Sequence, residues 1–173
     1  MLMIIFGQKE SGKTSKLFSE VQKIHTAERF RETRIYIDNA GANDACWTSL
    51  IDNNKVFLAS NNSGMLRSER DVFVFDANKI KEDDVSQFVS QILGLSSTNR
   101  VLLSLASYEK QYYPLFARAA KIVYMKTETE NIGSIPDEIL SRQNKAKLEK
   151  LSKGMKKYFS FCCPKGKPGY ETA

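Results

Sequence analysis

Histidine and cysteine are scarce in this 173-residue chain. It has one histidine, His25, and three cysteines, Cys46, Cys162 and Cys163. An odd number of cysteines, two of them adjacent, does not form the spaced framework of a disulfide scaffold. With a single histidine, a four-ligand structural zinc site is also disfavoured. We therefore expect reduced thiols and a fold that is held together by its core.

Long hydrophobic segments are missing as well. No apolar run approaches the roughly 20 residues that a membrane-spanning helix needs. The apolar segment Met1–Phe6 runs directly into a glycine, and it lacks the basic residues and the small-residue cleavage site of a signal peptide. We therefore expect no membrane span and a cytoplasmic location.

The composition that remains is that of a globular domain. Hydrophobic residues make up 42% of the chain and charged residues 27%, which is the profile of a soluble globular protein. The length suits one domain with a proper core. Because no internal repeat or linker divides the chain, we expect one domain over residues 1–163 and a basic, flexible tail over residues 164–173.

Positive charge is concentrated near the C-terminal end. Residues 142–167 contain nine lysines and arginines and one acid, Glu149, so this segment carries +8, whereas the whole chain carries +6. The remainder is therefore slightly acidic, at −2. A local basic stripe suits phosphate backbones or anionic surfaces. On composition alone, a solvated helix and tail is an equal alternative.

Short apolar runs alternate with amphipathic segments along the chain. Strands are expected at Met1–Phe6, Arg34–Asp38, Lys55–Ala59, Asp71–Asp76, Val101–Leu105, Lys121–Met125 and Lys157–Cys162. Helices are expected at residues 14–29, around 46–51, and at 82–93, 114–120 and 135–150, the last of them beginning at Pro136. This alternation favours an α/β fold with a mostly parallel central sheet flanked by helices.

Residues 7–14 read G-Q-K-E-S-G-K-T, a complete G-x-x-x-x-G-K-T phosphate-binding loop (P-loop). A buried strand leads into it and an amphipathic helix leads out, which is the context that this motif requires. Gly7 and Gly12 permit backbone angles that wrap amide groups around phosphates, and the helix directs its positive dipole end at the same oxygens. Lys13 is expected between the β- and γ-phosphates, and the Thr14 hydroxyl is expected on Mg²⁺. The predicted ligands are ATP and Mg²⁺, bound by Gly7, Gln8, Lys9, Glu10, Ser11, Gly12, Lys13, Thr14 and Ser15.

A P-loop also needs an acid that holds magnesium, usually at the end of a strand. Asp76 closes the apolar run Val72–Phe75 and fits that role, so Thr14 and Asp76 are the predicted metal ligands. Many hydrolysing P-loop proteins place a glutamate directly after this aspartate, but here the residue is Ala77. Glu10 is a candidate base, whereas the acids at 82–84 more simply favour the start of a helix. The catalytic base is left open.

The strand Val101–Leu105 is expected between the Asp76 strand and the P-loop strand, as in the additional-strand (RecA/ASCE-like) class of P-loop NTPases. Ser104 and Ser107, near the end of that strand, are options for sensing the γ-phosphate, with packing or turn roles as the alternative. Four arginines are candidates for an arginine finger that reaches a neighbouring subunit: Arg67, Arg70, Arg100 and Arg118. Arg118 is the first choice, so the predicted catalytic residues are Lys13, Asp76 and Arg118.

The order of these segments resembles the FtsK–HerA superfamily of ATPases, and within it the viral genome-packaging ATPases. The resemblance rests on GQKESGKT, on DVFVFD, on NRVLLSLASYEKQYYPLFARAAKIVYMK and on the closing LEKLSKGMKKYFSFCCPKGKPG. It spans most of residues 1–163, although only the P-loop is a specific motif. Ala77 and Ser107 depart from the family pattern, which commonly has an acid and a glutamine there.

This resemblance implies a homo-oligomeric ring that pumps double-stranded DNA while hydrolysing ATP. It also implies a location in the host cytoplasm or the virion, and docking to a capsid or portal-type viral protein. The basic C-terminal stretch would then face DNA or the capsid, with salt-sensitive, sequence-independent phosphate contacts.

Two other functions stay open at this stage. The P-loop and the helix after it also resemble those of thymidine kinases, although Ala77 and the small number of cysteines count against a nucleoside kinase. The other alternative is an ATP-binding switch or assembly factor that hydrolyses ATP poorly. GTP is disfavoured because none of the Asn-Lys pairs belongs to an Asn-Lys-x-Asp base-reading motif.

Overall fold

The computed structural model describes residues 1–27, 33–39, 47, 56–58, 71–76, 84–154 and 161–164. Its strands are β1 (Leu2–Phe6), β2 (Ile35–Asn39), β3 (Val56–Leu58), β4 (Val72–Asp76), β5 (Arg100–Leu105), β6 (Lys121–Tyr124) and β7 (Phe161–Pro164). Its helices are α1 (Lys13–Thr26), α3 (Val85–Thr98), the short 3₁₀ helix η4 (Lys110–Tyr112), α4 (Tyr113–Arg118), α5 (Thr129–Ser134) and α6 (Arg142–Gly154). Strands and helices alternate along much of the chain, as the sequence predicts.

The strands form one sheet in the order β3-β2-β4-β5-β1-β6-β7. The first six are parallel, and β7 pairs antiparallel with β6. Strand β5 lies between β1 and β4, so Ser104 is in register with Ile5 on one side and with Asp76 on the other. The expected mostly parallel sheet, with an additional strand between the P-loop strand and the Asp76 strand, is confirmed.

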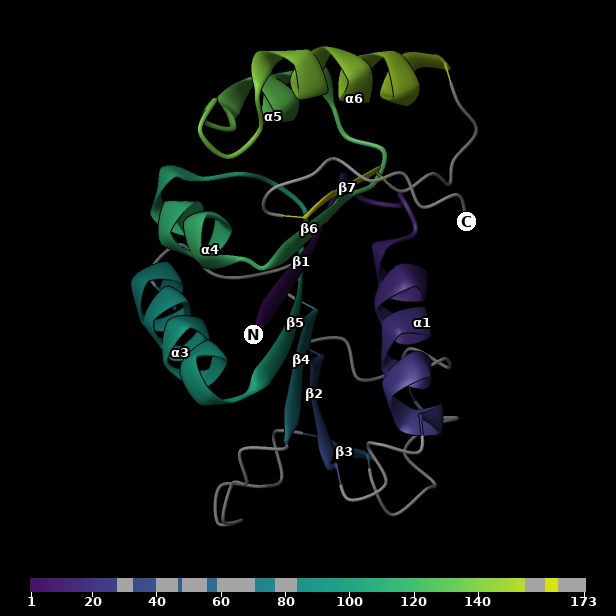
Figure 1. Ribbon diagram of the computed structural model, residues 1–173, viewed down its shortest axis with the longest axis vertical. Coiled ribbons are helices and arrows are strands. Elements are labelled where there is room, and N and C mark those ends of the chain that lie inside the picture. The colour runs from purple at the N-terminus through teal and green to yellow at the C-terminus, as the bar shows by residue number, and fades with distance from the viewer. Residues whose placement is uncertain are drawn as a thin grey trace.

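Helices cover both faces of this sheet. Helix α1 lies on one face, α3 and α4 lie on the other, and α5 and α6 lie over the end of the sheet near β7 (Figure 1). In β1, Leu2, Ile4 and Phe6 enter the core beneath α3 and α4, whereas Met3 and Ile5 enter the core beneath α1. Because a strand alternates its side chains between two faces, an unbroken apolar run is what burial on both faces requires.

The C-terminal helical region differs from the sequence prediction. The helix expected to begin at Pro136 begins at Arg142, and a separate short helix, α5, precedes it. The chain is extended at Ile135, and α6 then begins after Ser141, whose hydroxyl accepts a hydrogen bond from the Asn144 N–H at 3.4 Å. The prediction failed because a proline suits the start of a helix, whereas here a serine further along caps it.

The other boundary differences are small. The helix expected at 82–93 is found at Val85–Thr98, because its buried stripe continues beyond Ile92 to Leu95. The last strand is found at Phe161–Pro164. Trp47 is helical and buried, but the rest of the short helix expected around it lies outside the described residues, as does the tail from residue 165 onward. No helix among the described residues is long and apolar enough to cross a bilayer.

Candidate nucleotide-binding site

The P-loop lies between β1 and α1, at the edge of the sheet where the parallel strands end. Its first residues are anchored on both sides of β1. The Gly7 N–H donates to the Leu105 carbonyl at the end of β5 (3.1 Å), and the Gln8 N–H donates to the Lys126 carbonyl just after β6 (2.9 Å). The two neighbouring strands therefore fix where the loop starts.

Gly7 sits where a side chain has no room. A Cβ at this position would lie 2.7 Å from the Met125 Cβ, 2.8 Å from the Ser11 Oγ and 3.1 Å from the Lys126 carbonyl oxygen. Contacts below 3 Å require the neighbours to move, and here one neighbour is a β-carbon rather than the end of a flexible chain. The glycine is needed because the loop and the segment after β6 approach each other closely.

Two residues of the loop have left-handed backbone conformations. Gly12 has φ of 87° and Glu10 has φ of 62°. Glycine adopts this conformation freely, whereas for another residue it is uncommon and costs about 1–2 kcal/mol. Such strain is found mainly where a site requires it, and left-handed residues in a loop turn successive amide groups toward one anion-binding hollow. Glu10 is therefore held in an unusual conformation on the exposed side of the loop.

Lys13, at the start of α1, is buried, with 4% of its surface exposed. Its ammonium group donates to the Gln8 carbonyl at 2.7 Å. Burial lowers the pKa of Lys13, and the nearby Asp76 carboxylate acts in the opposite direction. A desolvated cation at the mouth of a loop is stabilised by a bound anion, which is the role that the motif predicts for it.

Thr14 and Asp76, which are 62 residues apart in the sequence, meet directly. The Thr14 hydroxyl donates to Oδ2 of Asp76 at 2.8 Å. The hydroxyl of Ser104, fully buried on β5, donates to the other oxygen, Oδ1. Both carboxylate oxygens of Asp76 are thus held by hydroxyls from two different elements, and the side chain is fixed in one orientation.

These residues fit a magnesium ion. Mg²⁺ prefers oxygen ligands, and in nucleotide sites it binds one or two protein oxygens together with phosphates and water. The Thr14 hydroxyl and the Asp76 carboxylate offer such oxygens directly beside the loop. When bound there, the ion would neutralise charge on the phosphate groups.

Other candidate residues lie away from this group. Arg118 is exposed at the end of α4, next to the beginning of β1, because the following Ala120 N–H donates to the Leu2 carbonyl at 2.8 Å. That is the opposite edge of the sheet from the P-loop, and Arg100 begins β5 at the same opposite edge. Within one chain, Arg118 therefore does not join Lys13 and Asp76. Arg67, Arg70, Ala77, Glu82 and Asp83 lie outside the described residues.

The contact between Ser104 and Asp76 was not predicted from the sequence. Ser104 was an option for sensing the γ-phosphate, whereas the structure shows its hydroxyl bound to the carboxylate of Asp76. Ser107 lies two residues beyond β5, half-buried, at the same edge as the loop. The signal for the Ser104 contact is the strand register, which becomes available only once β5 is known to pair with β4.

Comparison with known proteins shows which solved structures share this fold. No protein-family model matches the chain, and no curated protein matches it in sequence. Among solved structures, the genome packaging NTPase B204 of Sulfolobus turreted icosahedral virus 2, in complex with ATP-gammaS, superimposes with a TM-score of 0.57. The two are 14% identical over 98% of this chain and 95% of B204. The chain has the fold of a P-loop NTPase.

Two further structures support this assignment. B204 of Sulfolobus turreted icosahedral virus, a DNA-packaging ATPase, matches with a TM-score of 0.55 at 16% identity, over 94% of this chain and 91% of that one. The cytoplasmic domain of the type VII secretion ATPase EccC from Thermomonospora curvata matches with a TM-score of 0.66 at 10% identity. This match spans 99% of our chain but 25% of the EccC chain. The similarity to viral packaging ATPases that the sequence suggests is thus found in the fold.

Replacing Gly7 by alanine tests the close approach of the loop. The added Cβ would collide with Met125, so we expect Gly7→Ala to lower the free energy of unfolding by about 1–3 kcal/mol. Because the loop must shift, we also expect ATP affinity to fall roughly tenfold or more. Chemical denaturation and calorimetric ATP titration measure both effects. Gly94→Ala is the control, since a Cβ there meets nothing within 4 Å inside α3; if Gly7→Ala behaves like this control, the steric argument is wrong.

Replacing Ser104 by alanine tests how Asp76 is held. Removing the hydroxyl takes away the hydrogen bond that Ser104 donates to Asp76, a loss of about 1 kcal/mol in fixing the predicted magnesium ligand. We expect the Mg²⁺ concentration that half-saturates ATP binding to rise about fivefold, while ATP affinity at saturating Mg²⁺ changes little. Ser96→Ala is the matched control, because its buried hydroxyl donates only to the Leu93 carbonyl within α3. Equal magnesium requirements in both variants would contradict this role.

Proposed function

We propose that this protein is a magnesium-dependent ATPase that forms a homo-oligomeric ring and translocates double-stranded DNA. The observation that carries the hydrolytic part is the arrangement of Thr14, Asp76 and Ser104 beside Lys13 at the P-loop. The proposal for DNA is supported by the likeness in fold to the viral packaging ATPases and by the charge of α6.

The residues of the loop have distinct roles in the proposed reaction. Water attacks the γ-phosphorus, the bond between this phosphorus and the β–γ bridging oxygen breaks, and ADP and phosphate leave. The Lys13 ammonium group gives up its hydrogen bond to the Gln8 carbonyl and donates to the phosphate oxygens instead, where negative charge develops. Thr14 and Asp76 would hold Mg²⁺, which would offset charge on the phosphates. Glu10, exposed on the loop, is the candidate acceptor for the proton of the attacking water.

ATP is the proposed nucleotide. B204 has been solved with ATP-gammaS and with AMPPCP, and it shares the fold of this chain. The sequence also lacks the Asn-Lys-x-Asp motif with which many GTP-binding proteins read their base. Both points favour ATP over GTP.

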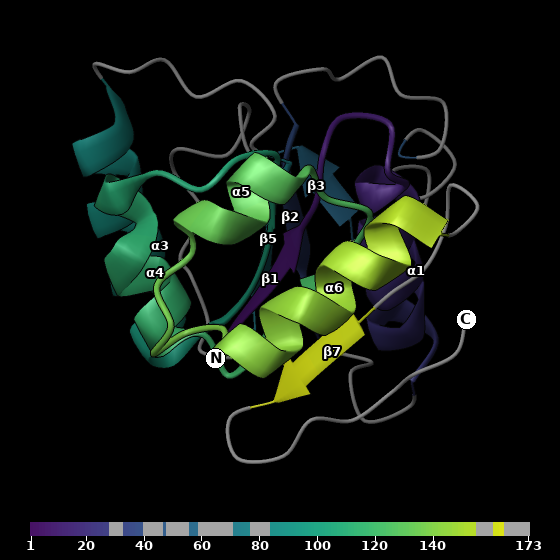
Figure 2. The same ribbon diagram turned by 90° about the horizontal axis from the view of Figure 1, so that it is seen from above.

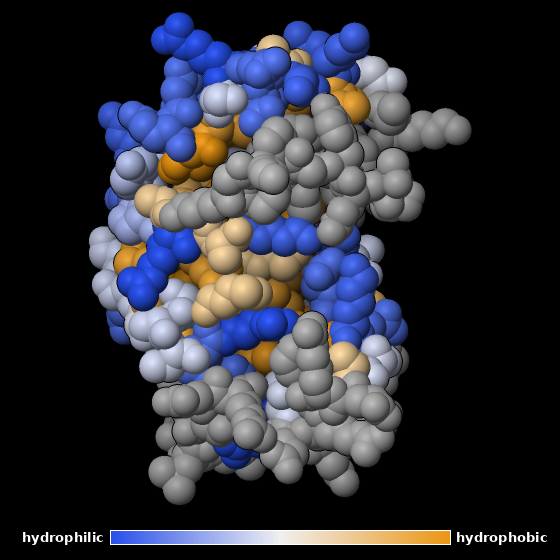
Figure 3. All heavy atoms as spheres, in the orientation of Figure 1, coloured by the Kyte–Doolittle hydropathy of each residue, from blue (hydrophilic) through white to orange (hydrophobic). Residues whose placement is uncertain are grey.

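Helix α6 is the proposed contact for the DNA backbone. It carries five basic residues and one acid, a net charge of +4: Arg142, Lys145, Lys147, Lys150 and Lys153 against Glu149. The helix lies across the end of the molecule, outside the sheet (Figure 2), where hydrophilic residues gather on the surface (Figure 3). An exposed basic helix suits phosphate contacts that release counterions, so DNA affinity should fall steeply with salt.

The ring is the proposed setting for Arg118. This arginine is exposed and lies at the edge of the sheet opposite to the P-loop. From that position Arg118 cannot reach the nucleotide of its own chain. In a ring, it can reach the nucleotide bound by a neighbouring subunit. A capsid or portal-type viral protein is the proposed docking partner of the ring.

ATP hydrolysis by the purified protein, with and without double-stranded DNA, tests this proposal. We expect turnover that DNA stimulates, and we expect Lys13→Ala to lower turnover roughly 100-fold or more by removing the charge that stabilises the transition state. Lys23→Ala is the control, because this lysine lies on the same helix but pairs with Glu20 at 3.0 Å on the surface.

The other outcomes separate the alternatives. Phosphate transfer to an added nucleoside would identify a kinase instead. Tight ATP binding without turnover, in the presence and absence of DNA, would identify a nucleotide-dependent switch.

A further inference from the structure

One peptide group connects the P-loop to the basic helix α6. It is the peptide that joins Lys126 to Thr127. Its carbonyl oxygen accepts a hydrogen bond from the Gln8 N–H at 2.9 Å, and its N–H donates to the Ser152 Oγ at 3.2 Å. Because a peptide group is planar and resists rotation about its C–N bond, the loop and the helix are bound to opposite ends of one rigid unit.

This peptide has little freedom to move independently. Thr127 is 1% exposed, and its own hydroxyl donates to the Met125 carbonyl at 2.7 Å. On the other side, the Lys126 carbonyl lies so close to Gly7 that a Cβ there would be 3.1 Å away. Because the loop and this peptide lie so close together, we expect the peptide to move when the loop is displaced.

The loop end of the connection is the part that nucleotide binding alters. The Lys13 ammonium now donates to the Gln8 carbonyl. A triphosphate competes for this ammonium group, because hydrogen bonds between a cation and a phosphate are stronger than those to a neutral carbonyl. We therefore expect the Gln8 carbonyl, which also accepts the Ser11 N–H at 3.3 Å, to lose the Lys13 ammonium when nucleotide binds; the Gln8 N–H is the group that holds the Lys126 carbonyl.

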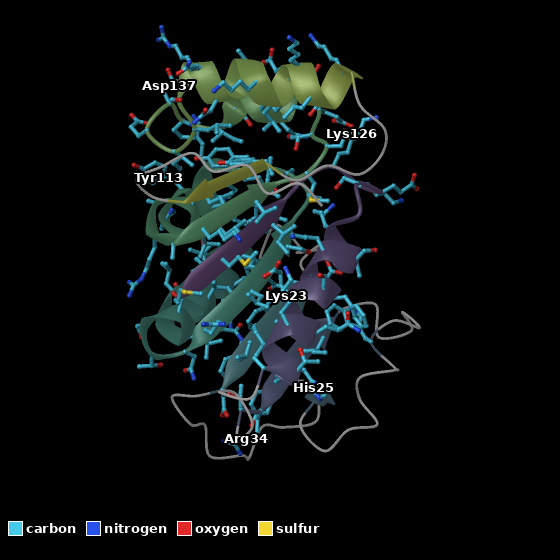
Figure 4. All side chains as sticks on the ribbon, turned by 45° about the vertical axis from the view of Figure 1, so that its right-hand side comes forward. Lys23, His25, Arg34, Tyr113, Lys126 and Asp137 are labelled. Carbon is cyan, nitrogen blue, oxygen red and sulfur yellow. The ribbon has the colours of Figure 1, made fainter. Side chains whose placement is uncertain are left out.

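Among the described residues, the side chain that hydrogen-bonds α6 to this peptide is that of Ser152. Helix α6 packs mainly on α5 and contributes Leu148 to the core. Near its C-terminal end, Ser152 is the residue that reaches the segment after β6. Lys126 lies beneath that end of the helix, whereas Asp137 lies at the other end (Figure 4). The basic helix is thus joined to the nucleotide site at one of its ends.

We propose that Ser152 couples α6 to the P-loop, and that nucleotide binding is transmitted to this helix through the Lys126–Thr127 peptide. The proposal rests on the proposed function in one respect, namely that the loop binds ATP. Coupling of this kind is reciprocal. A polyanion that binds α6 therefore changes ATP affinity by the same factor as ATP changes the affinity for the polyanion.

Amide hydrogen exchange tests the connection without relying on catalysis. The wild-type protein and Ser152→Ala are compared with and without AMPPCP and Mg²⁺, by mass spectrometry of peptides that cover residues 7–14, 124–130 and 142–154. In the wild type we expect nucleotide to slow amide exchange in the loop. We also expect it to change the amide exchange rates in α6 about fivefold or more. In Ser152→Ala we expect the loop to remain protected by nucleotide, while the change in α6 falls below about twofold.

Two further variants make the result specific. Ser152→Thr keeps a hydroxyl at this position and should restore the response of α6. Ser134→Ala removes a hydroxyl that donates only to the nearby Asn131 carbonyl in α5, and it should leave the response unchanged.

Two results would overturn the inference. One is a full α6 response in Ser152→Ala, and the other is a wild-type α6 that does not respond although the loop is protected. A loop that nucleotide does not protect in the wild type would instead refute ATP binding itself, and the inference with it.

Discussion

The carboxylate of Asp76 is the point at which the parts of this site meet. One of its oxygens accepts the Thr14 hydroxyl from the first turn of α1, and the other accepts the Ser104 hydroxyl from β5. These contacts require three strands in the order β4-β5-β1, because only then do Asp76, Ser104 and the start of the P-loop lie side by side. The hydrogen bonds that fix Asp76 therefore depend on the order of the strands in the sheet.

The same region carries a steric constraint. The segment after β6 passes so close to the P-loop that only glycine fits at position 7, and the Lys126 carbonyl there accepts the Gln8 N–H. This closeness fixes the loop, and it also places the loop in contact with a segment that reaches α6. Hydrogen bonds thus link the loop, through the segment after β6, to a helix at the surface of the molecule.

The sequence was sufficient for the features that depend on local pattern. The P-loop is a contiguous motif, and unbroken apolar runs identified the central strands, because burial on both faces leaves no alternation to read. Asp76 could be chosen because an acid that directly follows such a run must lie at the end of its strand. The inserted position of β5 came from a resemblance to P-loop proteins and not from the pattern of residues.

Other features depend on contacts that no local pattern contains. The bond between Ser104 and Asp76 joins residues 28 apart through strand register. The last helix was predicted to begin at Pro136, but the residue that caps its start is Ser141, and Asp137 lies before the helix and pairs with Arg142 (2.7 Å) and Lys145 (2.8 Å) in it. The contact between Ser152 and Thr127 depends on how α6 is placed after the chain has folded, so it was also missed.

The central claim is that Asp76 holds the magnesium of a bound nucleotide. Calorimetric titration of ATP-gammaS in Mg²⁺ and in EDTA, with the wild-type protein and with Asp76→Asn, tests it most directly. The account predicts that Mg²⁺ strengthens binding to the wild type and that Asp76→Asn loses this gain while keeping its affinity in EDTA, because Lys13 and the loop amides still bind the phosphates. An equal gain from Mg²⁺ in both proteins would contradict it.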